Sequence, residues 1–158
     1  MQLSDVFLQL GEERLGQLVR EISIGKLRTY QLYDRFRTRT HLPKVNTELL
    51  RKAVPKFWKR LQGHDVEFAT DLSQAILIAH MDMIIDVLNF LGIPNQEGFF
   101  EKDLEAKTYL TDGWQQRSID HFKGKYPEAL FLFYLNHLGC EVGGAEAAWL
   151  PPMQTPAA

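Results

Sequence analysis

The chain contains 158 residues, of which 45% are hydrophobic and 24% are charged, and its formal net charge is −2. A domain of this length can bury roughly 70% of the surface of its unfolded chain, so it needs no disulfide or metal to fold. The composition excludes a collagen-like fibre, a wholly disordered chain and a chain built mainly of membrane spans.

The cysteine content and the most apolar segment bear on the compartment. Cys140 is the only cysteine, so no disulfide can form within the chain, and a reducing compartment is favoured. The first residues lack the charged start and apolar stretch of a signal peptide. The most apolar stretch, 75–91, is interrupted by His80, Asp82 and Asp86, which is untypical of a membrane span. We therefore expect a cytoplasmic protein without a membrane partner.

Charge is unevenly distributed along the chain. Residues 26–60 contain eleven Lys or Arg and two Asp or Glu, a net charge of +9, so the remainder of the chain carries −11. Such a separation is typical of a surface that binds an anionic partner, and it also allows two parts of one fold to attract each other. Since the two charges can also complement each other between copies, a homodimer is a further hypothesis.

Apolar residues at helical spacing predict two helices before Pro43. The first has Ser4 as its N-cap and continues to about Ile22, with Gly11 as a weak point. The second covers about 27–38 and is short, amphipathic and basic. Pro43 ends it, because proline disfavours helical geometry in the residue before it and lacks a backbone donor.

A third helix is predicted to begin after Asn46, whose side chain suits an N-cap. Its outer face carries lysines and an arginine, and Pro55 is expected to kink or restart it. The buried stripe consists of Leu50, Ala53, Val54, Phe57 and Leu61. The helix therefore presents an apolar face to a core and a basic face to its surroundings.

The longest predicted helix covers about 66–91. Helical rotation places Asp71, Asp82, Asp86 and Asn89 within about 60° of one another, a narrow polar stripe on an otherwise apolar cylinder. This helix is predicted to lie at the centre of the fold.

The C-terminal third predicts a loop followed by two helices. Residues 95–107 are expected to form the loop, with one or two helical turns at its end. Thr111 is the predicted N-cap of a helix that continues to about Phe122. Pro127 suits the first turn of a second helix, which ends at Gly139. The apolar run inside that helix would also suit a buried strand, but no comparable second strand is present to pair with it.

Together these elements predict an all-α fold, a compact single-domain bundle of five to seven helices over residues 1–142. Residues 143–158 are rich in Ala, Gly and Pro and are predicted to form a flexible tail. Within this tail, Trp149 and Leu150 form an aromatic–aliphatic pair that would also suit a short docking motif.

The motifs of common enzyme classes are absent from the sequence. It contains no phosphate-binding glycine loop, no dinucleotide-binding Gly-x-Gly-x-x-Gly, no Gly-x-Ser-x-Gly, no His-Glu-x-x-His and no Glu-x-x-His. We therefore favour a non-enzymatic function and expect no cofactor.

Three groups of potential ligands were weighed against structural roles. His80 lies on an apolar face of the predicted central helix, where a buried, hydrogen-bonded histidine is commoner than a metal or haem ligand. His137 and Cys140 have a usable ligand spacing, but a structural zinc site needs four ligands. Asp82 and Asp86 lie one helical turn apart and could chelate a cation. We expect them instead to face solvent or to pair with arginines of the basic helices.

The two basic helices carry the main functional prediction. Each is expected to display arginines or lysines opposite its apolar face, forming a binding surface for an anion. The predicted surface consists of Arg28, Arg35, Arg37, Arg39, Lys52, Lys56, Lys59 and Arg60. The apolar spacing of Tyr30 and Trp58 predicts that both belong to the core.

Three functions were considered for this surface and its surroundings. The leading hypothesis is a non-enzymatic interaction module that holds a protein partner with an acidic surface. The alternative is a nucleic-acid-binding regulator that uses the same cations for phosphate contacts, although the predicted linker at 39–45 is longer than that of a helix-turn-helix. The third is a helical bundle that binds a ligand, haem or metal through His80.

Overall fold

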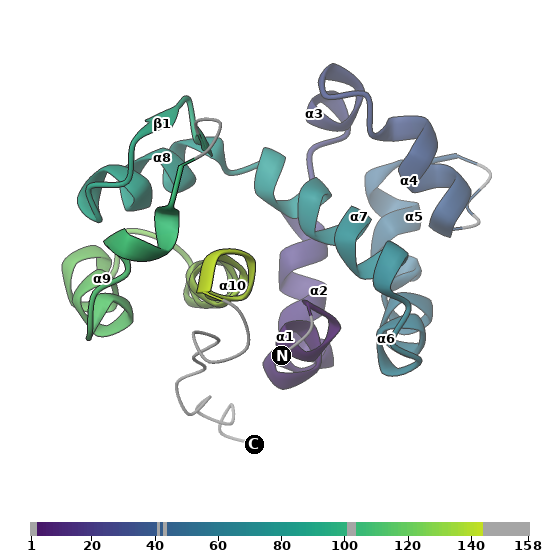
Figure 1. Ribbon diagram of the computed structural model, residues 1–158. Helices are drawn as coiled ribbons and strands as arrows, with labels where there is room; N and C mark the ends of the chain where they lie inside the picture. Colours follow the sequence, from purple (N-terminus) through teal and green to yellow (C-terminus); the bar gives the residue numbers. More distant parts are fainter. Residues whose placement is uncertain (1–2, 41, 43, 101–103, 144–158) are drawn as a thin grey trace. The chain divides into compact units, whose positions relative to one another are not determined.

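The chain is helical in both of its structural units. The computed structural model, shown in Figure 1, describes residues 3–40, 42, 44–100 and 104–143. Within these residues lie ten α-helices and one two-stranded hairpin, which confirms the all-α prediction. The described residues divide into two compact units, one up to Ala79 and the other from His80 to Gly143. The prediction of a single domain did not include this division.

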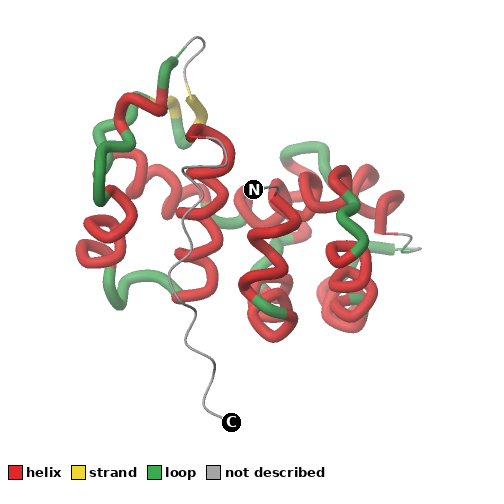
Figure 2. Tube along the Cα trace, turned by 60° about the horizontal axis from the view of Figure 1, so that its bottom comes forward, coloured by secondary structure: helices red, strands yellow, loops and turns green. Residues whose placement is uncertain are grey.

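Short helices pack closely in the first unit. Its described helices are α1 (Leu3–Leu10), α2 (Glu12–Arg20), α3 (Ile24–Thr29), α4 (Tyr33–Thr40), α5 (Thr47–Lys52), α6 (Val54–Gln62) and α7 (Val66–Ile78). Helix α1 packs against α2, α6 and α7, while α2 also contacts α5, and α3 and α4 pack on α7. Figure 2 shows these helices joined by short connections. The apolar faces of all seven are thus turned toward shared cores.

Three phenylalanines form the aromatic centre of this unit. The ring centroids of Phe36 in α4 and Phe57 in α6 lie 6.2 Å apart at an edge-on angle of 68°. Phe57 and Phe68 in α7 lie 5.2 Å apart. All three side chains are essentially inaccessible to solvent. Such pairs contribute about 0.5–1.5 kcal/mol each beyond their burial, so they fix how α4, α6 and α7 face one another.

The described residues contain more helices than the five to seven predicted, because four predicted helices are each interrupted. The first divides at Gly11, whose φ of 94° suits glycine, and Ser4 lies inside α1 rather than at its N-cap. The second divides near Gln31, which has a φ of 61°. The third divides at Ala53, one residue before α6 and its early proline.

The prediction of one long central helix over 66–91 is wrong. Helix α7 ends at Ile78, and the next helix begins at Met81, with His80 at φ −132° and ψ 37° between them. The predicted polar stripe is therefore split: Asp71 lies buried in α7, and the other three polar residues lie in the following helix. No glycine or proline occurs at the break, so the usual local signals for a helix end are missing.

The second unit combines helices with irregular segments. Its elements are α8 (Met81–Phe90), β1 (Asn95–Gln96), β2 (Phe99–Phe100), the 3-10 helix η1 (Ala106–Tyr109), α9 (Trp114–Phe122), α10 (Glu128–Leu138) and the π-helix η2 (Gly139–Gly143). The segment predicted as a loop thus contains a small hairpin and the start of η1. Gly98 has a φ of 92° in the hairpin turn, which lies against Met81 of α8.

Helix α10 is buried on almost every side, as its uniformly apolar sequence requires. Every residue from 129 to 136 is buried. It follows Pro127 and ends at Leu138, and the π-helix η2 continues from Gly139. The choice of helix over strand and the predicted start are therefore confirmed, whereas Gly139 does not end the helical structure. The predicted N-cap at Thr111 is wrong, because α9 begins at Trp114 after Gly113. Among the described residues, no helix is long and apolar enough to cross a membrane.

Little of the predicted tail can be compared with the structure. Gly143 is the last residue of η2. Residues 144–158, including Trp149 and Leu150, lie outside the described residues, so the flexible tail and its docking motif stay predictions.

Asp86 joins α8 to the connection between α9 and α10. Its carboxylate accepts hydrogen bonds from the Tyr126 hydroxyl and from the Lys125 ammonium, the latter at 3.0 Å. The bond from Tyr126, and then that from Lys125, lowers the pKa of Asp86. Partial burial, and then the bond to Asp86, raises the pKa of Tyr126 to about 12. Asp86 therefore pairs with a lysine of its own unit, not with an arginine of the basic helices.

Neutralising Asp86 is expected to weaken the second unit in a pH-dependent way. Because the pKa of Asp86 is lower in the folded chain than in the unfolded one, its contribution is present above pH about 4 and is lost as the pH falls through the folded value. Asp86→Asn should lower the free energy of unfolding by about 1 kcal/mol at pH 7, measured by urea denaturation, and by less at pH 3. Equal losses at both pH values, or a similar loss in exposed Asp112→Asn, would contradict this role.

Candidate cationic interaction surface

The candidate surface is carried by α5 and α6, which follow each other almost without interruption. Asn46 caps α5, because its side-chain oxygen accepts a bond of 2.9 Å from the Leu49 amide. Ala53 ends α5 and precedes α6, and Pro55 lies in the first turn of α6, where its missing donor costs nothing. The predicted cap and the predicted restart at Pro55 are confirmed.

The apolar side of these helices determines which residues face outward. Leu50, Ala53, Phe57 and Leu61 are buried, as predicted, while Val54 is only half-buried. Three lysines are exposed: Lys52, Lys56 and Lys59. Lys56 and Lys59 are three residues apart in α6 and share one face, and Lys52 precedes Lys56 by one helical turn. We call these three residues the lysine face.

The lysine face has little internal charge compensation. Lys52 lies 3.2 Å from Glu48, but both side chains are more than 70% exposed, so the pair contributes little. Within the described part of the chain, Lys56 and Lys59 form no ion pair. Residues 1–79 contain thirteen Lys or Arg and nine Asp or Glu, a net charge of +4. The face is therefore available to an anionic partner.

Two of the predicted surface residues, Arg35 and Arg60, instead form contacts within the unit. Arg35 Nε lies 3.1 Å from the carboxylate of Asp71, whose side chain is 2% exposed. Arg60 donates bonds of 3.0 and 2.7 Å to Asp65 and lies over the ring of Phe68 at 4.8 Å. Since Asp65 also caps α7, both arginines stabilise the position of α7 more directly than they offer charge to a partner.

The remaining predicted arginines lie on α3 and α4. The Arg28 guanidinium lies 4.8 Å from the ring centroid of Tyr33, and Arg37 lies 3.7 Å from Asp34 in an exposed pair. The side chain of Arg39 lies outside the described part of the chain. The seven predicted residues whose side chains the structure describes therefore divide by partner: Arg35 and Arg60 contact the acids that position α7, whereas Arg28 and the lysine face stay exposed.

Sequence reasoning left three exposed cations of residues 26–60 out of the predicted surface and placed two aromatic residues wrongly. The three cations are Lys26, Lys44 and Arg51. Tyr30 is 38% exposed at the end of α3, and Trp58 is half-buried. Neither belongs to the buried core, contrary to the prediction, because the helix expected to bury Tyr30 ends there.

The third hypothesis, a ligand, haem or metal site at His80, gains no support from the position of that residue. His80 lies in the break between α7 and α8 and not on an apolar face of a continuous helix. His137 lies 3.2 Å from Glu141. Among the described residues, no group of three or more histidine, cysteine or acidic side chains is arranged to hold a metal ion.

A serine, a histidine and an aspartate meet elsewhere in the first unit, in a way that sequence reasoning missed. Ser4 Oγ lies 3.4 Å from His64 Nδ1, and the Asp5 carboxylate lies 4.0 Å from the same nitrogen. A hydrolytic triad needs the acid and the nucleophile on different ring nitrogens. This cluster therefore does not have the geometry for activating a serine.

Replacing Arg35 should affect stability, in contrast to replacing a lysine of the face. Arg35→Gln leaves the buried Asp71 charge less compensated and should lower the free energy of unfolding by about 2 kcal/mol. Adding Asp71→Asn should restore much of that loss, because no buried charge then remains. Lys56→Gln should change stability by less than about 0.5 kcal/mol. Urea denaturation measures all three, and an Arg35→Gln variant as stable as wild type would show that Asp71 does not depend on it.

Comparisons with known proteins leave this surface to be interpreted from its own chemistry. No protein-family model, curated protein or solved structure matches the chain. The function of a protein depends on the chemistry of its sites rather than on its fold. The functional hypothesis for this chain therefore depends on the charge, exposure and partners of the side chains described above.

Proposed function

We propose that the chain is a non-enzymatic interaction module that binds an acidic surface of a partner protein through the lysine face. The observation that carries this proposal is the exposure of Lys52 at the end of α5 and of Lys56 and Lys59 in α6. In α6 the two lysines share a face that does not include the buried Phe57. A lysine ammonium is a flexible, strongly hydrated point charge. It suits carboxylate clusters whose positions need not be matched with bidentate geometry.

The rigid support behind these lysines favours recognition over a diffuse charge effect. Phe57 is held between Phe36 and Phe68, so α6 presents Lys56 and Lys59 at a fixed separation along its axis. Complementary charges mainly increase the association rate and the selectivity of an interface. We therefore expect an interaction of moderate affinity that weakens as salt is added.

A nucleic-acid partner is the second candidate, and one local feature favours it. Helices α3 and α4 are joined by only three residues, 30–32, a connection of helix-turn-helix length and shorter than the linker considered from the sequence. Against this, α3 has six residues and Arg35 of α4 is engaged by Asp71. An overall pI of about 6.2 is also low for a protein dedicated to nucleic acid.

The test is a comparison of binding by variants with equal net charge. A variant carrying Lys52→Gln, Lys56→Gln and Lys59→Gln should lose a partner that wild type retains in a pull-down at low salt. The matched control replaces the exposed Arg20, Lys26 and Lys123 by glutamine and should retain it. With a purified partner, loss of three exposed ion pairs should weaken binding by about tenfold or more, measured by calorimetry.

The outcomes separate the two candidates. Retention that resists nuclease, and a partner with an excess of acidic residues, support the protein-binding proposal. Nuclease-sensitive retention, with binding to a DNA or RNA duplex lost in the lysine variant, supports the nucleic-acid candidate. Equal behaviour of the lysine variant and the control would contradict both. If the partner is a second copy, sedimentation at low salt should show wild type as a dimer and the lysine variant as a monomer.

A further inference from the structure

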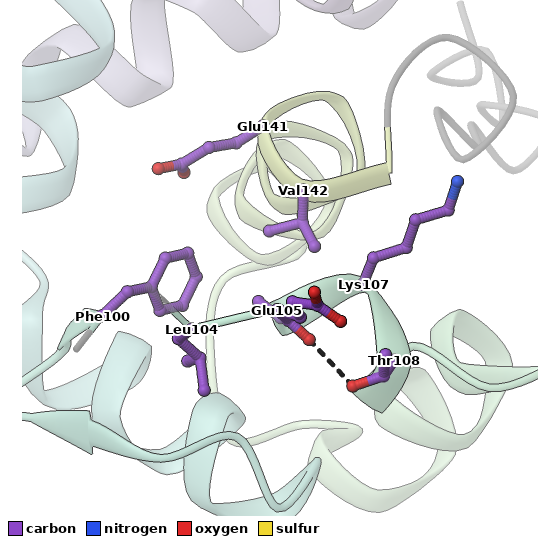
Figure 3. A pocket seen from close by; sticks show the side chains of 8 residues that line it. Phe100, Leu104, Glu105, Lys107, Thr108, Glu141 and Val142 are labelled. Carbon is purple, nitrogen blue, oxygen red and sulfur yellow. Dashed lines mark hydrogen bonds between the residues drawn. The ribbon is translucent and has the colours of Figure 1, made fainter. Parts of the chain in front are cut away.

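The second unit contains an open pocket unrelated to the lysine face. It has a volume of about 660 Å³ and is formed by β2, η1, η2 and the residues just before η1. Its apolar lining consists of Phe100, Leu104, Ala106 and Val142. In the view of Figure 3, Phe100 and Leu104 lie together on one side of the pocket, across from Val142 and Glu105. The volume falls within the range of pockets for small ligands.

Local backbone features build this pocket. The hydroxyl of Thr108 donates a bond of 2.8 Å to the Glu105 carbonyl and so steadies the first turn of η1. Beyond Gly139, α10 widens into the π-helix η2, which packs against η1 and brings Glu141 and Val142 to the pocket. Short π-helical segments are rare and recur at functional sites. The pocket thus combines residues about 35 positions apart in the chain.

The charges around the pocket are predominantly negative. Glu105 and Glu141 both line it, and Glu141 also lies 3.2 Å from His137. Lys107 is the one cation among the lining residues, and in Figure 3 its side chain extends away from Phe100 and Leu104. Residues 80–158 contain five Lys or Arg and eleven Asp or Glu, a net charge of −6. The potential at the pocket therefore favours a positive ligand.

We propose that this pocket binds a small organic cation, an ammonium group attached to an apolar body. The apolar body would be covered by Phe100, Leu104 and Val142, and the ammonium would be placed between the carboxylates of Glu105 and Glu141. A ring face such as that of Phe100 also attracts a cation. Neither carboxylate needs a metal or a covalent step for this role.

Three probes of similar size and different charge test the proposal. They are 2-phenylethylammonium, the neutral 2-phenylethanol and the anionic 3-phenylpropanoate. Titrated into the full chain and followed by amide chemical shifts, the cation should perturb Ala106, Thr108 and Val142 and bind about fivefold more tightly than the alcohol. The anion should bind most weakly. Equal affinities, a preference for the anion, or no binding of the cation at millimolar concentration would each overturn the proposal.

Variants show whether the two carboxylates are responsible. Glu105→Gln with Glu141→Gln should remove the preference for the cation and leave the weak binding of the alcohol unchanged. The control, Asp112→Asn with Asp120→Asn, changes the net charge equally at exposed positions that do not line the pocket and should keep the preference. Loss of the preference for the cation in both variants would show that the preference comes from the overall charge of the unit, and it would overturn the proposed site. Unchanged amide shifts in α8, which contains none of the substituted residues, would show that each variant is folded.

Discussion

The packing of Phe57 between Phe36 and Phe68 is the interaction on which the first unit depends. It places the apolar side of α6 against α4 and α7, and it leaves the opposite side of α6 exposed. Because residues three and four apart share a helical face, the same rotation that buries Phe57 and Leu61 exposes Lys56 and Lys59. The core and the candidate surface are thus two consequences of one helical register.

Charge counted along the sequence overstates the charge that the folded chain offers to a partner. Residues 26–60 carry +9, yet Asp71 and Asp65, both outside that segment, draw Arg35 and Arg60 into contacts that secure α7. The buried Asp71 carboxylate strongly requires a compensating cation, and the half-buried Asp65 holds Arg60 by two hydrogen bonds, so folding engages both arginines. Lysines without such partners remain, and they form a smaller and better-defined surface than the eight residues predicted.

Regular periodicity made part of the fold predictable. The apolar stripe of α5 and α6, the Asn46 cap and the start of α10 follow from burial, hydrogen bonding and proline at an expected place. The break at His80 does not, because the sequence continues a helical apolar pattern through it without glycine or proline. Tertiary packing decides such a position, and with it the single polar stripe predicted for Asp71 and Asp86 disappears.

The acidic pocket was beyond sequence reasoning for a different reason. Its walls come from a two-residue strand, a 3-10 helix and a π-helix, none of which has a periodicity that a sequence pattern reveals. Once formed, it has the opposite charge to the lysine face. A ligand selected by one site is repelled by the other, since attraction and repulsion between charges discriminate partners together. If both proposals hold, the division of charge between the two units allows one small chain to bind a cationic and an anionic partner without competition.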